Sequence, residues 1–335
     1  MTEINRRVVL ANRPSGMVDD ETVRVETDPR PEPAAGEALV KVGYLSIDPT
    51  IRTWMNDAPG YLPPIGVGEV IRSGGIGEVV ESTHEGYSVG DLVFGMTGWQ
   101  EYAVIPGGDR SWQQLPAGLD APTAMNVFGI NGMTAYFGLL DVGRMAEGDT
   151  VVVSGAAGAT GSTVGQIAKL KGAGKVVGIA GGPEKCAYVI EKLGFDAAVD
   201  YKAPRLGSIL HEHCPNGIDV YFDNVGGAIL NTALAQLAMR GRVVICGAIS
   251  AYNATERIEG PANYINLIPK RGRMEGFLVF DYARRYPEAQ GEILTWLLEG
   301  KLNHDEHIVH GLENAPKALN LLFTGGNTGK VVVKL

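Results

Sequence analysis

A run of glycines between residues 155 and 165 carries the clearest chemical signal in the sequence. Residues 151–165 read VVVSGAAGATGSTVG. Glycine lets a backbone turn tightly and approach a ligand closely, and the N-terminus of a helix offers free N–H groups with a partial positive charge. In a turn between a strand and a helix, these features are typical of the pyrophosphate loop of a dinucleotide site. The alternative is a tight strand–turn–helix connection that binds no ligand.

The end of the next predicted strand indicates which dinucleotide binds. A protein that prefers NAD has an Asp or Glu there, which binds the ribose hydroxyls. Here the strand ends with the sequence GIAGG at 178–182, which holds no acid, and Lys185 follows shortly after. The missing carboxylate and the nearby lysine favour the 2′-phosphate of NADP(H), because a carboxylate would repel that phosphate. The alternative for Lys185 is a solvated lysine on a helix.

A second candidate segment, Cys246–Asn253, follows the fifth predicted strand of the same region. Ligands of open α/β sheets bind at the carboxyl ends of the strands, so Tyr252 could donate a hydrogen bond to a substrate oxygen there. The alternative is a half-buried loop tyrosine. Tyr44, Tyr61 and Arg52 could line a pocket, although ordinary core or surface roles are the favoured interpretation of those three residues.

The distribution of cysteine and histidine argues against a catalytic zinc ion. Residues 1–125 hold no cysteine and one histidine, His84, so that region offers no ligand set. The histidines at 211 and 213 and those at 304, 307 and 310 are expected to be incidental surface residues. No G-x-S-x-G sequence occurs, so a serine hydrolase is not supported. We therefore expect no metal site.

Two kinds of secondary structure must position these residues. Residues 1–125 predict a β-rich region, with strands such as 38–44, 66–71 and 91–94 between turn clusters. From residue 126, apolar strand-length runs alternate with amphipathic helices, which is typical of a doubly wound parallel sheet. The predicted strands are 150–154, 175–180, 197–200, 219–223 and 242–246, and the predicted helices are 162–171, 183–193 and 228–239. The tail predicts strands at 307–310 and 330–334 around a helix at 315–323.

Composition excludes several classes of partner and location. The chain has 335 residues, 46 glycines and a formal charge of −9, from 29 basic and 38 acidic residues, so nucleic acids and anionic membranes are poor partners. Three widely spaced cysteines predict no disulfide framework. We expect no signal peptide and no transmembrane helix, and therefore a cytoplasmic location.

Eight motifs resemble the zinc-independent medium-chain dehydrogenases/reductases, and within them the NADPH-dependent prostaglandin reductases and the bacterial curcumin-reductase-like double-bond reductases. The resemblance covers nearly the whole chain. It rests on DPTIR at 48–52, YLPPIGVGEV at 61–70, GMTAYFGLL at 132–140, AGATGS at 157–162, YFDNVGG at 221–227, CGAIS at 246–250, LEGK at 298–301 and GNTGK at 326–330.

The resemblance implies an α/β fold in which a GroES-like, β-rich substrate domain accompanies a Rossmann domain. Residues 1–125 would form the substrate domain, residues 126–300 the NADP-binding domain, and residues 301–335 a tail that returns to the substrate domain. It also implies a homodimer. The pattern departs from that of the family at Asn131, where a proline is usual, and by one residue inserted between Lys185 and Tyr201, which weakens the assignment of Tyr201.

Site residues also follow from the resemblance, position by position. The pyrophosphate loop would be Gly158, Ala159, Thr160 and Gly161, and the contacts of the 2′-phosphate and adenosine would be Lys185 and Tyr201. The nicotinamide side would include Asn224, a strand made of Phe277, Leu278 and Val279, and the segment Cys246, Gly247, Ala248, Ile249 and Ser250 with Tyr252. Asn327 would return from the tail as a further cofactor contact.

The function that the resemblance implies is NADPH-dependent reduction of the carbon–carbon double bond of a small, hydrophobic α,β-unsaturated ketone or aldehyde. Hydride would reach the β-carbon, and Tyr252 would stabilise the enolate oxygen. Two alternatives stay open: a quinone or carbonyl reductase on the same scaffold, and a non-catalytic NADPH-binding sensor.

Overall fold

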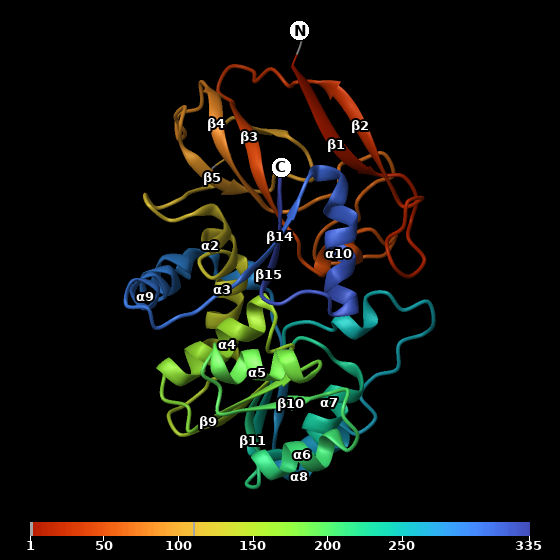
Figure 1. The fold of residues 1–335 in the computed structure, drawn as a ribbon, viewed down its shortest axis with the longest axis vertical. Helices are drawn as coiled ribbons and strands as arrows, with labels where there is room; N and C mark the ends of the chain where they lie inside the picture. The colour runs from red at the N-terminus through yellow and green to blue at the C-terminus, as the bar shows by residue number, and fades with distance from the viewer. Residues whose placement is uncertain (1–2, 110) are drawn as a thin grey trace. The chain divides into compact units, whose positions relative to one another are not determined.

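The computed structural model describes residues 3–109 and 111–335, and Figure 1 shows its ribbon. Its internal contacts divide the chain into two compact units. Unit 2 is the continuous segment Asn126–Asp305. Unit 1 combines the N-terminal part of the chain, up to Met125, with the C-terminal segment Glu306–Leu335.

A parallel sheet forms the centre of unit 2. Its strands lie in the order β10-β9-β8-β11-β12-β13, and each neighbouring pair is parallel. The chain runs outward from β8 through β9 to β10 and then returns to the other side of β8 at β11, so the strand order reverses between β8 and β11. The strands are β8 (Thr150–Ser154), β9 (Lys175–Ala180), β10 (Ala197–Asp200), β11 (Ile218–Asp223), β12 (Leu237–Ile245) and β13 (Arg273–Gly276).

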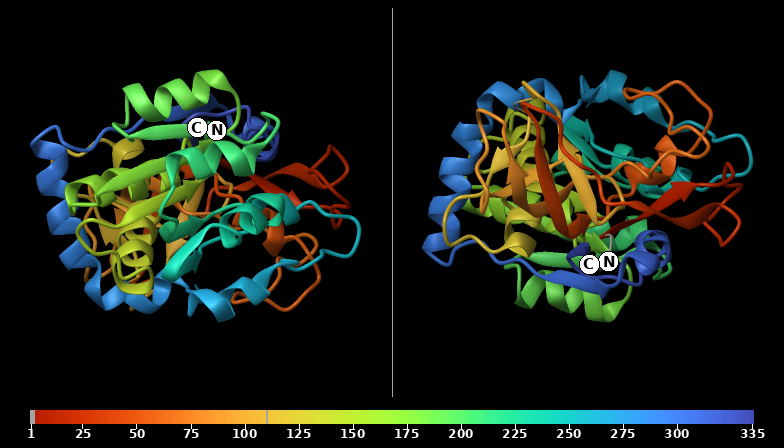
Figure 2. Two further views of the ribbon diagram at one scale, coloured as in Figure 1. Left: turned by 90° about the horizontal axis from the view of Figure 1, so that it is seen from below. Right: turned by 90° about the horizontal axis from the view of Figure 1, so that it is seen from above.

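Helices cover both faces of this sheet (Figure 2). Successive strand residues point to opposite faces, so Val151 and Val153 belong to one buried core and Val152 to another. The predicted doubly wound α/β fold is confirmed. The helices are α3 (Ile130–Phe137), a π-helical turn (Gly138–Val142), α4 (Ala159–Leu170), α5 (Pro183–Glu191), α6 (Leu206–His213), α7 (Gly227–Leu234), α8 (Leu267–Lys270) and α9 (Tyr286–Leu298), with 3₁₀ turns at Ile249–Ala251, Tyr264–Asn266 and Val279–Arg285.

Three predicted elements were wrong in extent or type. The helix predicted at 228–239 ends at Leu234, because Leu237 is fully buried and already pairs with Ile218 as the start of β12. Phe277–Val279 is not a strand, since β13 ends at Gly276 and a 3₁₀ turn begins at Val279. Residues 66–71 form a loop that is joined to β1 by an isolated bridge between Val9 and Val70 and by backbone hydrogen bonds, and not by a continuous strand pairing.

Unit 1 is built on a mostly antiparallel sheet that the C-terminal tail completes with the parallel pair β14–β15. The strand order is β14-β15-β3-β4-β5-β7, with β6 also paired to β3. In the ribbon the tail elements, drawn in blue, lie beside the red and orange N-terminal strands (Figure 1). The elements are β1 (Ile4–Leu10), β2 (Val23–Pro29), β3 (Ala38–Ser46), α1 (Thr50–Trp54), β4 (Gly75–Ser82), β5 (Leu92–Gly95), β6 (Tyr102–Ile105), β7 (Gln113–Gln114), α2 (Ala121–Asn126, whose last residue belongs to unit 2), β14 (Glu306–His310), a 3₁₀ turn (Leu312–Asn314), α10 (Ala315–Thr324) and β15 (Lys330–Lys334).

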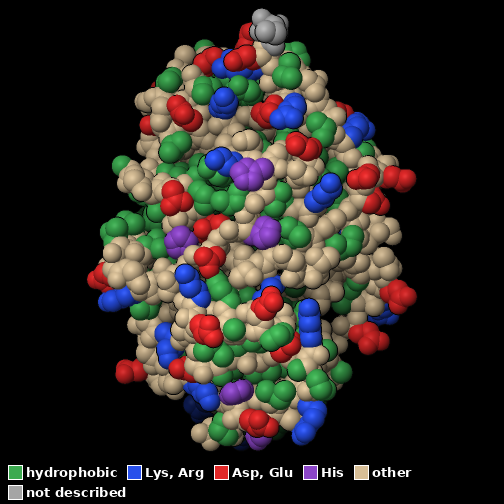
Figure 3. Space-filling view, in the orientation of Figure 1, with side chains coloured by type: hydrophobic (Ala, Val, Ile, Leu, Met, Phe, Trp, Pro, Cys, Tyr) green, Lys and Arg blue, Asp and Glu red, His purple; other side chains and the backbone are tan. Residues whose placement is uncertain are grey.

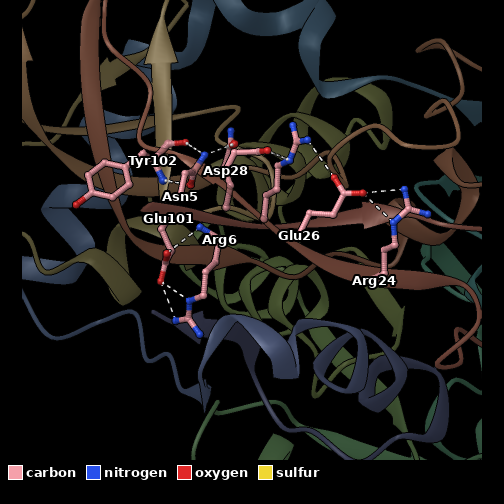
Figure 4. A network of polar contacts seen from close by, with 9 residues as sticks. Asn5, Arg6, Arg24, Glu26, Asp28, Glu101 and Tyr102 are labelled. Atoms are coloured by element: carbon pink, nitrogen blue, oxygen red, sulfur yellow. Dashed lines mark hydrogen bonds and ion pairs between the residues drawn. The ribbon is translucent and has the colours of Figure 1, made fainter. Parts of the chain in front are cut away.

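The two-stranded sheet of β1 and β2 is held to the rest of unit 1 by charged and amide side chains (Figure 4). Arg6 donates three hydrogen bonds to Glu101, two from its guanidinium and one from its backbone N–H, and Asn5 exchanges hydrogen bonds with the backbone of Tyr102. Across these two strands, Arg7 pairs with Glu26 at 3.0 Å. Because most of these pairs are partly solvated, we expect each to contribute less than about 1 kcal/mol to the free energy of unfolding. Their main effect is to fix the register of these strands.

Acidic and basic side chains are interspersed on the face of the molecule drawn in Figure 3. Within residues 3–109 and 111–335, none of the helices combines the length and the apolar character that crossing a membrane requires.

Candidate active site

Three neighbouring strands of unit 2 end side by side, and polar residues lie at those ends. Ser154 is the last residue of β8, Asp223 is the last residue of β11, and Cys246 follows β12. The reversal of strand order between β8 and β11 makes this edge the topological switch point of the sheet. Open α/β sheets bind ligands at that position.

The Asp223 carboxylate is the centre of hydrogen bonding at this edge. The side chain is only 1% exposed. Its Oδ1 accepts hydrogen bonds from Ser154 Oγ (3.0 Å), Tyr221 Oη (2.9 Å), Val225 N (3.1 Å) and Gly226 N (3.0 Å). One carboxylate oxygen therefore joins β8, β11 and the loop that starts α7.

Asn224 is fixed by the same network. Its backbone N–H donates to Ser154 Oγ (2.9 Å), and its side-chain Nδ2 donates to the Ser154 carbonyl (2.7 Å). Both donor groups of Asn224 are therefore used to hold it against the end of β8. The amide Oδ1 is the atom of this half-buried side chain that can accept a hydrogen bond from a bound molecule.

Burial sets the protonation of this cluster. It raises the pKa of the Asp223 carboxyl, although the hydrogen bonds from Gly226 and Val225 oppose that shift. It raises the pKa of the Tyr221 phenol well above its usual range, so Tyr221 acts as a neutral donor. Burial, with the nearby charge of Asp223, raises the pKa of the Cys246 thiol to about 12. Cys246 is thus a protonated thiol at neutral pH and not a nucleophile.

The Cys246–Tyr252 segment folds back on itself at the end of β12. The N–H groups of Cys246 and Gly247 donate to the Asp223 carbonyl, at 2.9 and 3.0 Å. Ser250 Oγ donates to the Val225 carbonyl (2.6 Å), which joins the segment to the loop after β11. The half-buried Tyr252 accepts the Ala248 N–H at its hydroxyl oxygen (3.1 Å). Accepting that bond polarises the phenol O–H and strengthens it as a donor.

The glycine-rich turn between β8 and α4 needs glycine for different reasons at different positions. Gly155 has a φ of +61°, whereas Gly158 has an extended backbone with a φ of −89°. A Cβ on Gly161 would lie 2.3 Å from the Gly155 carbonyl oxygen, and one on Gly165 would lie 1.8 Å from the ring of Phe195. Gly161 thus lets α4 begin directly against the turn, with the first-turn N–H groups at the end of β8.

Asn131 contacts this turn from α3. Its Nδ2 donates to Thr160 Oγ1 at 3.3 Å. The position where the chain departs from the proline of the resembled family therefore supplies a side chain to the glycine-rich turn.

The end of β9 gathers an aromatic ring and two lysines. A Cβ on Gly181 would lie 2.7 Å from the ring of Tyr201, so glycine is what lets that ring lie across the strand end. Lys185 is half-buried in the first turn of α5, where burial and the charge of Lys202 lower the pKa of its ammonium. Two ammonium groups that repel each other at a strand end favour the binding of an anion between them, because the anion neutralises both charges.

One acid at this strand end, from the neighbouring strand, is occupied by backbone donors. Asp200, the last residue of β10, accepts the N–H groups of Gly182 (2.8 Å) and Lys202 (2.9 Å) at Oδ1. These bonds lower the pKa of its carboxyl. Asp200 therefore shapes the turn after β9 from the neighbouring strand.

The remaining predicted contacts are a segment after β13 and a residue of the tail. Phe277 follows Gly276, which pairs with Ile245 at the end of β12, so this segment begins at the same edge of the sheet. Phe277 packs in the core, since a Cβ on Gly138 would lie 2.6 Å from its ring, and Val279 is buried while Leu278 is partly exposed. Asn327 lies in unit 1, in the turn before β15, where its Nδ2 donates to the Gly329 carbonyl (3.1 Å).

Comparison with known proteins places this arrangement in a family. Residues 6–112 match the N-terminal domain of oxidoreductases, and residues 159–295 match the zinc-binding dehydrogenases. The chain is 43% identical to the NADPH-dependent curcumin reductase of Escherichia coli, over 99% of this chain and 97% of the relative. The chain belongs to the medium-chain dehydrogenase/reductase family.

Two further members of the medium-chain dehydrogenase/reductase family are equally extensive matches. The 2-alkenal reductase (NADP(+)-dependent) of Nicotiana tabacum is 40% identical, over 98% of this chain and 97% of the relative. The crystal structure of CurA from Vibrio vulnificus in complex with NADPH is 44% identical, covers 98% of both chains and superposes with a TM-score of 0.93.

A zinc ion does not fit the residues of this medium-chain dehydrogenase/reductase, although one matched family is named for zinc binding. In the described part of the chain, no group of three or more His, Cys, Asp or Glu side chains is placed to hold a metal ion.

Sequence reasoning missed four residues that shape these strand ends: Ser154, Tyr221, Asp223 and Lys202. Asp223 carried a usable signal, because an acid ended an otherwise apolar strand run. Ser154 lies 69 residues away from it in the chain, and only the sheet order makes the two neighbours.

Proposed function

We propose that this member of the medium-chain dehydrogenase/reductase family reduces the carbon–carbon double bond of small, hydrophobic α,β-unsaturated ketones and aldehydes with NADPH. The observation that carries the proposal is whole-chain identity of 40% or more to a curcumin reductase and a 2-alkenal reductase, each named for NADPH or NADP(+). Unit 2 would be the cofactor-binding domain, and unit 1 would be the substrate domain.

The residues at the strand ends fit NADP(H). Its pyrophosphate would lie at the turn formed by Gly158, Ala159, Thr160 and Gly161, against the N-terminus of α4. The 2′-phosphate would lie between Lys185 and Lys202, with the adenosine on Tyr201. The nicotinamide half would contact Asn224, the backbone of Cys246–Ser250 and the segment Phe277–Val279, and Asn327 would contribute from the tail. NADPH, when bound, supplies a hydride for the β-carbon of the substrate.

Tyr252 has the central chemical role in this proposal. As the β-carbon is reduced, negative charge develops on the substrate carbonyl oxygen as an enolate. The Tyr252 hydroxyl, polarised by the Ala248 N–H, would donate a hydrogen bond to that oxygen, and a fixed donor of this kind is typically worth about 2.7–4 kcal/mol of barrier. Water would then protonate the α-carbon.

A substrate panel tests the reaction class. NADPH oxidation is followed by absorbance with a 2-alkenal or enone, a quinone and a saturated ketone in parallel, and the product of the enone reaction is identified by mass and NMR. We expect turnover with the enone and a saturated carbonyl product. Turnover only with the quinone, or only with the saturated ketone, would contradict the proposal, and NADPH binding without any turnover would favour a sensor.

Lys185→Ala is expected to raise the KM for NADPH roughly 10- to 100-fold while leaving the KM for NADH nearly unchanged, because only NADPH loses a charge-assisted hydrogen bond to the 2′-phosphate. Steady-state kinetics with both cofactors measure this. Lys192→Ala, at the other end of α5, is the matched control and should change neither value. Equal losses for NADPH and NADH would rule out a contact with the 2′-phosphate.

We also propose that the protein is a cytoplasmic homodimer. The free cysteines Cys186, Cys214 and Cys246 suit a reducing compartment.

Edge strand β13 exposes Met274, and Ile265 and Ile268 nearby are more than half exposed, which suits pairing with a second copy. Light scattering should give twice the 35.6 kDa chain mass, and Met274→Lys should shift it toward the monomer. A monomeric wild-type protein would contradict this.

A further inference from the structure

We propose that Asp223 is a positioning residue, which fixes the loop Asn224–Gly227 so that Asn224 and the turn after β12 can receive the nicotinamide half of the cofactor. The inference rests on the proposed function, since it assumes that NADP(H) binds at these strand ends. It assigns Asp223 no contact with the cofactor.

The carboxylate of Asp223 is almost completely buried and is bonded at one oxygen only. Four donors converge on Oδ1, at 2.9 to 3.1 Å, from Ser154, Tyr221, Val225 and Gly226. Within the described residues, Oδ2 is buried and has no hydrogen-bond partner. A buried acid is unfavourable unless its hydrogen bonds compensate for lost hydration. A buried carboxylate at this position therefore indicates a role that an apolar side chain could not fill.

That role is visible in the loop that Asp223 holds. Gly226 and Gly227 have positive φ values of 73° and 57°, which glycine adopts as readily as many other conformations. Oδ1 fixes the loop in this one conformation by accepting the N–H of Val225 and of Gly226. Ser154 Oγ, which donates to Oδ1, in turn accepts the N–H of Asn224 (2.9 Å). Asp223 thus sets the position of Asn224 by two routes.

The backbone of Asp223 extends this control to the neighbouring turn. Its carbonyl accepts both the Cys246 N–H and the Gly247 N–H. Ser250 is bonded to the Val225 carbonyl in the loop that Asp223 organises. The loop after β11 and the segment that carries Tyr252 therefore form one hydrogen-bonded network, and Asp223 connects its two parts.

The sheet order separates this hydrogen-bonded network from the other end of the cofactor site. Asp223 lies on β11, on one side of β8, whereas Lys185, Tyr201 and Lys202 follow β9 and β10 on the other side. A disturbance at Asp223 should therefore weaken contacts of the nicotinamide half and spare those of the adenosine half. A general loss of folding would affect both halves alike.

Asp223→Asn keeps the shape of the side chain and weakens the acceptor that four donors share. We expect the Kd for NADPH to rise and kcat to fall, each roughly 10-fold or more, because charge-assisted hydrogen bonds become neutral ones. The Kd for adenosine 2′,5′-bisphosphate, which fills only the adenosine half, should stay within about twofold, and the melting temperature is recorded beside both titrations. Ser154→Ala should give the same pattern with smaller changes.

Asp219→Asn is the matched control, because Asp219 lies at the opposite end of β11 and accepts the Thr150 N–H (2.9 Å). It should leave both affinities and kcat unchanged. Equal weakening of both ligands in Asp223→Asn, or a lower melting temperature with unchanged NADPH affinity and kcat, would overturn the proposal. A wild-type protein that binds NADPH but reduces no enone would overturn the proposed reaction alone and leave the affinity comparison valid.

Discussion

Replacing Tyr252 by phenylalanine is expected to lower kcat and kcat/KM together, by roughly 10- to 1,000-fold, with NADPH affinity nearly unchanged. The phenylalanine keeps the ring and removes only the hydroxyl. Enolate charge develops during hydride transfer, so the lost hydrogen bond stabilises the transition state more than the bound substrate. The wide range reflects a second donor, a cofactor ribose hydroxyl or water, that can share the oxyanion.

Steady-state kinetics with an enone, together with an NADPH titration, measure the effect. Tyr264→Phe is a suitable control, because Tyr264 follows on the same strand connection and is 60% exposed. An unchanged kcat with a higher KM would make Tyr252 a substrate-binding residue. No change in either value would mean that the hydroxyl serves only to bind the Ala248 N–H.

The second large effect is expected on stability, at the buried lysine of unit 1. Lys330 is 1% exposed, and its Nζ donates to the Ile47 carbonyl (2.7 Å) and to Asp48 Oδ1 (2.8 Å). Asp48→Asn would leave this ammonium buried without its counter-charge. Breaking a buried pair from one side typically costs about 3–5 kcal/mol in the free energy of unfolding.

The pH dependence of Asp48→Asn provides an internal check. Burial lowers the pKa of the folded Lys330 ammonium, and Asp48 opposes that shift. A lowered pKa in the folded state means that the proton is bound more weakly than in the unfolded chain. The buried Lys330 charge therefore lowers the free energy of unfolding by its full amount at pH values below the folded pKa. This destabilisation disappears as the pH rises past the unfolded pKa near 10.5. The stability gap between variant and wild type should therefore narrow toward alkaline pH.

Urea unfolding at several pH values measures this gap. Asp57→Asn, from the exposed loop that follows α1, is the control and should change stability by less than about 0.5 kcal/mol. A gap that is constant with pH would show that the lost hydrogen bonds of Asp48, and not its charge on Lys330, determine the cost.

The sequence predicted β8 and β9 well because their valine-containing apolar runs are bounded by glycines and charged residues. It overextended the helix before β12 because the apolar pattern continues from Ala228 through Leu237 without a glycine or proline. The chain instead starts β12 at Leu237, which pairs with Ile218, and a register shift follows within the strand, where Arg240 has a positive φ. Local pattern does not encode that shift.

The candidate site shows the same limit. The glycine-rich turn and Lys185 could be identified from the sequence, since their meaning depends on residues close along the chain. The partners of Asp223 could not, because Ser154 comes from a strand 69 residues earlier. Likewise, the acceptor role of the Tyr252 hydroxyl depends on the 3₁₀ turn Ile249–Ala251, which returns the ring to Ala248.

The position of β15 in unit 1 has a consequence for how the protein is made. β15 pairs with both β14 and β3, and Val331, Val332 and Val333 are buried. During translation, unit 2 is complete once Asp305 has left the ribosome, while β3 still lacks its neighbour from the far end of the chain. Unit 1 must therefore wait, with an open sheet edge, until residues 330–334 have left the ribosome, so a ribosome that stalls before that point leaves a folded unit 2 attached to an unfinished, aggregation-prone unit 1.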